Sequence, residues 1–157
     1  MNGNGSVAFR VFGKPVSQGS MKFIGAGKPM IHSNKNLKPW REAVGWAAKQ
    51  TWQDEIVTGG VVVHCVFKFK RPKCHFGTGG NSMKLVPSAP TRYLQRPDED
   101  KLSRAIKDAL TGIIFKDDAQ VDECHIYKKW AEAGEQEGVV IIIDTEPAEG
   151  SETCQQE

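Results

Sequence analysis

The chain has 157 residues, of which 21 are Lys or Arg and 19 are Asp or Glu, so its net charge at pH 7 is only +2. This length suits a single domain with a buried core, and the ordinary composition excludes a fibrous or disordered chain. No apolar run approaches the length of a membrane span, and the first residues lack the pattern of a signal peptide. We therefore expect a soluble, cytoplasmic protein with no membrane partner.

The charge is unevenly distributed along the chain. Residues 1–50 hold eight Lys or Arg and a single acid, Glu42, whereas residues 131–157 hold eight acids and no Lys or Arg. A basic N-terminal part suits an anionic partner such as nucleic acid, although a solvated basic surface has the same composition. We expect one domain over residues 1–145 and an acidic C-terminal tail over residues 146–157.

The first half of the chain is divided by its apolar periodicity and its turn residues. Residues 7–12 are expected to form a strand, and residues 13–37 a long basic loop or irregular hairpin. A helix is predicted from residue 39 to about residue 54, and a strand over residues 61–70. The Gly- and Pro-rich residues 72–92 are expected to form a long mobile loop.

The clearest helix is predicted over residues 98–111. One apolar face is formed at helical spacing by Leu102, Ala105, Ile106, Ala109 and Leu110. Gly112 is placed to end this helix. Strands are predicted over residues 120–130 and 139–144, separated by a turn. The order β-α-β-α-β-β predicts a single α+β domain, with helices packed on a mixed or antiparallel sheet.

Four carboxylates lie at the two ends of this helix. Asp98 and Asp100 precede and begin it, and the pair Asp117-Asp118 lies in a turn beyond it. Such carboxylates repel one another unless a cation intervenes, and Mg²⁺ favours oxygen ligands of this kind. The structural alternative is that Asp98 caps the helix and Asp100 is an ordinary first-turn acid. If helix and strand pack side by side, the turn can return Asp118 towards Asp98.

Two cations accompany the carboxylates. Arg104 follows Asp100 by one helical turn, and Lys128 shares a strand face with Asp118. Beside a phosphate, such cations would neutralise charge that develops during the reaction. On a plain surface, Arg104 would form a weak salt bridge and Lys128 would be solvated.

The chain has four cysteines, Cys65, Cys74, Cys124 and Cys154. Three of them adjoin a histidine, in the pairs His64-Cys65, Cys74-His75 and Cys124-His125. None of the spacings is of the C-x-x-C type, and neighbours on a strand point to opposite faces. Free thiols in a reducing compartment are favoured, with a zinc-stabilised interaction module as the alternative.

Three motifs occur in a fixed order in the second half of the chain. They are D-x-D at Asp98-Glu99-Asp100, D-A-L-x-G at Asp108-Ala109-Leu110-Thr111-Gly112, and D-D-x-Q-V at Asp117-Asp118-Ala119-Gln120-Val121. With Arg96-Pro97 before them and Lys128 after them, these motifs resemble the RusA family of Holliday junction resolvases, common in bacteriophages and prophages. The likeness is strong over residues 94–130 and looser from residue 13 to about residue 40.

The resemblance implies a homodimeric endodeoxyribonuclease of DNA recombination and repair, which resolves four-way (Holliday) junctions by paired symmetric nicks. It implies Mg²⁺ as the cofactor, with Mn²⁺ able to replace it, and no nucleotide cofactor. The catalytic residues carried over are Asp98, Asp100, Asp118 and Arg104, and the metal ligands are Asp98, Asp100, Asp118 and Asp117. The protein would act in the cytoplasm of a bacterial or phage-infected cell.

The sequence departs from the family pattern at two positions. Arg104 stands where the family commonly has lysine, and it keeps the charge but cannot donate a proton at neutral pH. Lys101 stands where the family usually has asparagine, which adds a positive charge beside the site.

DNA contacts are expected mainly on phosphates, which gives salt-dependent binding with little base readout. The expected DNA-binding residues are Lys14, Lys22, Lys28, Lys35, Lys101 and Lys128. Two other functions remain open at this stage. One is a structure-selective nuclease for other branched DNA, and the other is a non-catalytic DNA-binding protein.

Overall fold

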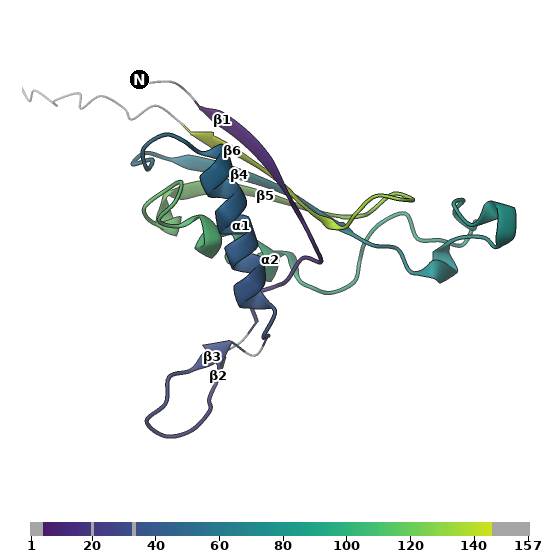
Figure 1. Cartoon of the computed structure of the whole chain (residues 1–157), viewed down its shortest axis with the longest axis horizontal. Coiled ribbons are helices and arrows are strands. Elements are labelled where there is room, and N and C mark those ends of the chain that lie inside the picture. The colour runs from purple at the N-terminus through teal and green to yellow at the C-terminus, as the bar shows by residue number, and fades with distance from the viewer. Residues whose placement is uncertain (1–4, 20, 33, 146–157) are drawn as a thin grey trace, which may run out of the picture.

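The computed structural model describes residues 5–19, 21–32 and 34–145, and a four-stranded sheet forms its centre (Figure 1). The strands are β1 (Ser6–Phe12), β4 (Val61–Phe69), β5 (Val121–Trp130) and β6 (Gly138–Thr145). Along β4 each buried residue alternates with a half-exposed one. One face of the sheet therefore packs on a core while the other faces solvent.

The strand order across the sheet is β1-β6-β4-β5. β6 pairs antiparallel with both β1 and β4, whereas β4 and β5 are parallel. The sheet is therefore mixed, and β5 is one of its two edge strands. This topology matters for the site, because β5 carries Lys128 near its end and follows Asp118 at its start.

Two helices cover one face of the sheet (Figure 1). Helix α1 (Leu37–Thr51) packs over β1, helix α2 (Glu99–Leu110) packs over β5, and the two helices contact each other. The predicted α+β single domain is thereby confirmed. Helix α1 begins before the predicted residue 39, because Pro39 needs no backbone hydrogen bond in the first turn. It ends at Thr51 rather than residue 54, where Trp52 adopts an extended backbone.

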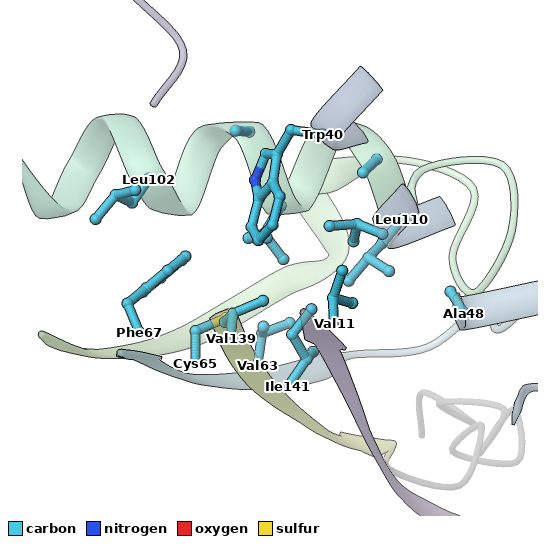
Figure 2. Packing of buried hydrophobic residues seen from close by; sticks show 14 of the residues in the cluster. Val11, Trp40, Ala48, Val63, Cys65, Phe67, Leu102, Leu110, Val139 and Ile141 are labelled. Carbon is cyan, nitrogen blue, oxygen red and sulfur yellow. The ribbon is translucent and has the colours of Figure 1, made fainter. Parts of the chain in front are cut away.

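The core lies between the helices and the sheet (Figure 2). Phe67 of β4 and Ile141 of β6 are fully buried, and Leu102 of α2 and Trp40 of α1 cover them from above. The thiol of Cys65 belongs to this core, and burial raises its pKa above the ordinary range. Cys65 is therefore a neutral packing residue, while its neighbour His64 is on the opposite face.

The segment that follows α2 is part of the same core. Gly112 has a φ of +83° and ends the helix as predicted, because few other residues adopt this backbone conformation. Its N–H donates to the carbonyl of Phe115 at 2.7 Å. Ile114 and Phe115 are fully buried, so this short segment is anchored at the C-terminal end of α2.

Two extensions leave the domain on different sides (Figure 1). The predicted basic loop contains a short hairpin of β2 (Met21–Lys22) and β3 (Ile31–His32) beside the start of α1. Residues 72–92 project beyond the end of the sheet at which β4 ends, and they contain two 3₁₀ turns, η1 (Lys73–His75) and η2 (Gly79–Asn81). The mobility expected of this loop stays a prediction.

No helix in the described part of the chain has both the length and the apolar character that a membrane crossing requires. The acidic tail expected over residues 146–157, which includes Cys154, lies outside the described residues.

Candidate active site at the two ends of helix α2

Asp98 occupies the N-cap position of α2, but its side chain accepts no capping hydrogen bond. Its Oδ2 instead lies 3.5 Å from Nζ of Lys101, and 54% of the side chain is exposed. Asp100 follows in the first turn and is also exposed. The positive end of the helix dipole favours negative charge here. Both carboxylates are therefore accessible to a cation, and the Asp98 carboxylate makes no hydrogen bond that caps the helix.

The segment that leads into Asp98 is held by one side chain of β5 and by one of its own side chains. Nζ of Lys128 donates to the carbonyl oxygens of Gln95 and Pro97, at 2.9 Å each. The hydroxyl of Tyr93 donates to the carbonyl of Arg96 at 2.6 Å. These contacts position the backbone immediately before Asp98.

Tyr93 lies in an aromatic cluster at the end of the core. Its ring stacks on Phe69 at a centroid distance of 4.2 Å and meets Trp130 edge-on at 4.6 Å. Burial, and then the charge of Glu137, raise the pKa of Tyr93, so its hydroxyl remains a donor. The sequence did not predict that Tyr93 and Trp130 support the site. The only signal was that one aromatic residue lies near each end of residues 94–130, which contain the motifs.

A cleft of about 430 Å³ opens beside Asp98. Its lining includes Lys14, Arg96, Asp98 and Lys101, together with residues of the segment from Pro15 to Gly19. The N–H of Gln18 donates to the carbonyl of Lys101 at 3.0 Å, which joins this segment to the first turn of α2. Cations and a carboxylate thus share one cleft.

The second acidic pair lies at the start of β5. Asp117 Oδ1 accepts the N–H of Ala119 at 2.9 Å and caps the short helix η3 (Asp118–Gln120). The amide of Gln120 fixes the turn: its oxygen accepts the N–H of Asp117 at 2.9 Å, and its nitrogen donates to the carbonyl of Val57 at 2.8 Å. Asp118 is exposed on this turn. The carboxylate of Asp117 therefore has a structural task that Asp118 does not share.

The two acidic groups are at opposite ends of α2. The helix runs antiparallel to β5: Lys128 contacts Pro97 at one end, and Ser103 Oγ lies 3.3 Å from Cys124 Sγ farther along. The 12 residues of α2 span about 18 Å. The anchored residues after Gly112 keep the turn at the far end, so one protomer does not return Asp118 to Asp98.

Within the ranges that the structure describes, no three His, Cys, Asp or Glu side chains are gathered so as to hold a metal ion. This includes the Cys/His pairs considered for zinc. His64 instead stacks on His125 at a centroid distance of 4.7 Å, and each ring has a carboxylate partner, Asp144 at 3.5 Å and Glu123 at 3.1 Å.

Only some of the predicted cations lie near the first acidic group. Arg104 is exposed on α2, one turn after Asp100, while Asp108 farther along pairs with Arg41 of α1 at 4.0 Å. Lys14 and Lys101 line the cleft with Asp98. The remaining predicted DNA contacts fall outside the cleft: Lys22, Lys28 and Lys35 are exposed on the segment before α1, and Lys128 is bonded to backbone carbonyls.

Comparison with known proteins covers this whole region. A family described as endodeoxyribonuclease RusA matches residues 13–144. A protein of Bacillus subtilis (strain 168) named "Uncharacterized protein YqaN" is 31% identical over 130 residues, which span 80% of this chain and 89% of that protein. Both acidic groups, the cleft and the basic segment fall within the family match.

Proposed function

The chain belongs to the RusA family of endodeoxyribonucleases and is therefore a nuclease, and on this premise we propose that it resolves four-way DNA junctions by two symmetric nicks that depend on Mg²⁺. The observation that carries the proposal is the cleft at the start of α2. There the exposed carboxylate of Asp98 lies beside Lys14, Arg96 and Lys101. Cations that bind phosphates next to acids that bind a metal are what hydrolysis of a phosphodiester requires.

The donor set fits Mg²⁺. Asp98 and Asp100 offer exposed, hard oxygen atoms, and neither is tied up in a helix cap. Mg²⁺ usually takes one or two protein carboxylates and completes its shell with water and phosphate oxygens. Asp98 and Asp100 would hold the ion, and Asp118 would add a third carboxylate. When bound, Mg²⁺ supplies an activated water and neutralises charge on the phosphate.

The protein's own cations orient the DNA and stabilise its charge. Lys14 and Lys101 bind backbone phosphates at the cleft, which positions a strand over Asp98. Arg104 remains charged throughout the reaction and stabilises the charge on the phosphate, without acting as a proton donor. Lys128 and Tyr93 act indirectly, by holding the carbonyls of the segment that ends at Asp98.

A homodimer would complete the site. A two-fold axis reverses the direction of α2 and β5 in the second copy, so the start of one α2 would face the start of the partner's β5. β5 is an edge strand, and most of its residues are exposed. Antiparallel pairing of β5 across the axis would extend the sheet and bring Asp98 and Asp100 towards Asp118 of the second copy. Two such sites match two symmetric cuts.

The test is cleavage of a synthetic four-way junction by the wild type and by Asp100→Asn, in Mg²⁺ and in EDTA, with linear duplex as the control substrate. We expect paired nicks with 5′-phosphate and 3′-hydroxyl ends, which a ligase seals, only with the wild type in Mg²⁺. Equal cutting of flaps or other branches would make the protein a more general structure-selective nuclease. Tight junction binding without any cutting would contradict the proposal and favour a DNA-binding protein.

A further inference from the structure

A second groove, here called the Trp46 groove, runs along the outer side of α1. It encloses about 750 Å³ and is lined by residues that include Lys35, Leu37, Arg41, Gly45, Trp46 and Ile113. The groove lies between α1 and the turn that follows α2. Of these residues, Lys35 was expected from the sequence to contact DNA, and the proposed catalytic site uses none of them.

The floor of the groove is apolar and closely packed. At Gly45, an added Cβ would come within 3.2 Å of Ile113 Cδ1 and 3.5 Å of the Ala109 carbonyl oxygen. Helix α1 therefore packs directly on the end of α2 and the turn that follows it, because glycine has no side chain to separate them. Trp46 follows at once and is 64% exposed. The opposite side of α1 packs into the core, through Trp40 and other buried residues. The indole of Trp46 is therefore available to a ligand.

The rim of the groove is positively charged. Four cations and one acid line it: Lys35, Lys38, Arg41, Lys49 and Glu42. Lys38 is 3.9 Å from Glu42, and Arg41 is 4.0 Å from Asp108. Among the described side chains, no carboxylate lies within 4.0 Å of Lys35 or Lys49. An anionic ligand with an apolar face fits this combination better than a neutral one.

The Trp46 groove continues the catalytic cleft. Asn34 lines both the groove and the cleft that contains Asp98. Asn34 precedes α1, which begins at Leu37, so the two depressions adjoin near the N-terminal end of that helix. A strand bound at Asp98 would therefore reach Trp46 by following the surface of α1.

We propose that the Trp46 groove binds an unpaired segment of DNA, with a base stacked on the indole of Trp46 and phosphates on Lys35 and Lys49. This inference rests on the proposed function, since it assigns this groove to the same branched substrate. An aromatic face combined with cations is the usual device for single strands, because every unpaired base has a face to stack. A base inside a duplex is already stacked on its neighbours and offers no free face.

The test measures binding without metal, so that its result is independent of cleavage. Fluorescence anisotropy in EDTA compares the binding of a labelled single strand with that of a duplex of equal length, for the wild type and Trp46→Ala. A strand of about 20 nucleotides is long enough to cover more than one binding site. We expect Trp46→Ala to weaken single-strand binding about five-fold or more, with much less effect on the duplex. Trp46→Phe keeps a stacking face and is expected to bind nearly as the wild type does.

Phe12→Ala is the matched control, because Phe12 is an exposed aromatic residue on the sheet face that the helices do not cover. It is expected to leave both affinities unchanged. Unaltered single-strand binding by Trp46→Ala overturns the inference, whether or not the wild type cleaves junctions. Conversion of a dimer to a monomer by Trp46→Ala, seen by sedimentation, also overturns it, because the groove would then hold a second copy of the chain.

Discussion

Asp117 and Asp118 are neighbours in the sequence, but their carboxylates have different surroundings. Asp117 caps η3 through the N–H of Ala119, whereas Asp118 is exposed beside it. We expect Asp117→Ala to lower the free energy of unfolding by about 1 kcal/mol, and Asp117→Asn to restore most of it by keeping a capping oxygen. Asp118→Asn should abolish cleavage and leave stability unchanged. Urea denaturation and junction cleavage measured on the same preparations check both expectations. Normal cleavage by Asp118→Asn would contradict the assignment.

Lys128 was expected to contact DNA, but its ammonium donates to the carbonyls of Gln95 and Pro97. Lys128→Met should therefore lower the free energy of unfolding by about 1–2 kcal/mol, because two hydrogen bonds to a charged group are lost. Its effect on DNA affinity should not depend on salt. Lys22→Met, on the exposed hairpin, is the control: it should leave stability unchanged and reduce the salt slope of binding by about 0.9. The reverse pattern would make Lys128 the phosphate contact.

Among the elements, the turn between β5 and β6 depends on ionised Glu135. The N–H of Glu132 donates to its carboxylate at 2.8 Å, and Lys68 and Arg10 lie within 3.5 Å and 3.2 Å. The backbone hydrogen bond and then these charges lower the pKa of Glu135, against the opposing effect of burial. A folded-state pKa below the unfolded value of about 4.3 means that this stabilisation is present above that pH and is lost as pH falls through the folded-state pKa.

Thermal unfolding of the wild type and Glu135→Gln at several pH values checks this expectation. The variant should melt at a lower temperature at neutral pH, and the difference should shrink as the pH falls through the folded-state pKa of Glu135, because the wild-type carboxyl then becomes protonated as well. A difference that persists at acid pH would mean that packing, and not ionisation, secures the turn.

Local sequence patterns predicted most of the helices and strands, because each pattern extends over the same short run of residues as the element that it predicts. The apolar face of α2 and its end at Gly112 follow from helical spacing and from glycine, and the alternation in β4 follows from the strand period. The position of Asp118 relative to Asp98 is different. It depends on the direction in which α2 crosses β5 and on the anchoring of Phe115, which are long-range properties of packing. The hydrogen bond from the Tyr93 hydroxyl to the carbonyl of Arg96 depends on the same long-range packing.

For the whole molecule, the separation of the acids explains why a nuclease of this size would work as a dimer. One protomer places Asp98, Asp100 and several cations at one end of α2, and Asp118 at the other. A solitary protomer would hold a metal weakly, and it would have no means of cutting two strands in concert. In the proposed dimer, a single contact between the two copies would supply both the third carboxylate and the second active site. Activity would then follow the concentration of dimer.

Mixing two inactive variants distinguishes a shared site from a site within one protomer. Asp100→Asn and Asp118→Asn homodimers should each be inactive, because either substitution damages both sites. If each site combines Asp98 and Asp100 of one copy with Asp118 of the other, a heterodimer of the two variants contains one intact site and one doubly altered site. With random exchange, half of the dimers would be heterodimers, so roughly one quarter of the wild-type sites would return, and each would make a single nick.

If all three carboxylates acted within one protomer, every site in the mixture would carry one substitution. Nicking of a labelled junction after subunit exchange, with each variant alone as the control, therefore decides the question: a mixture as inactive as its parents would rule out the shared site.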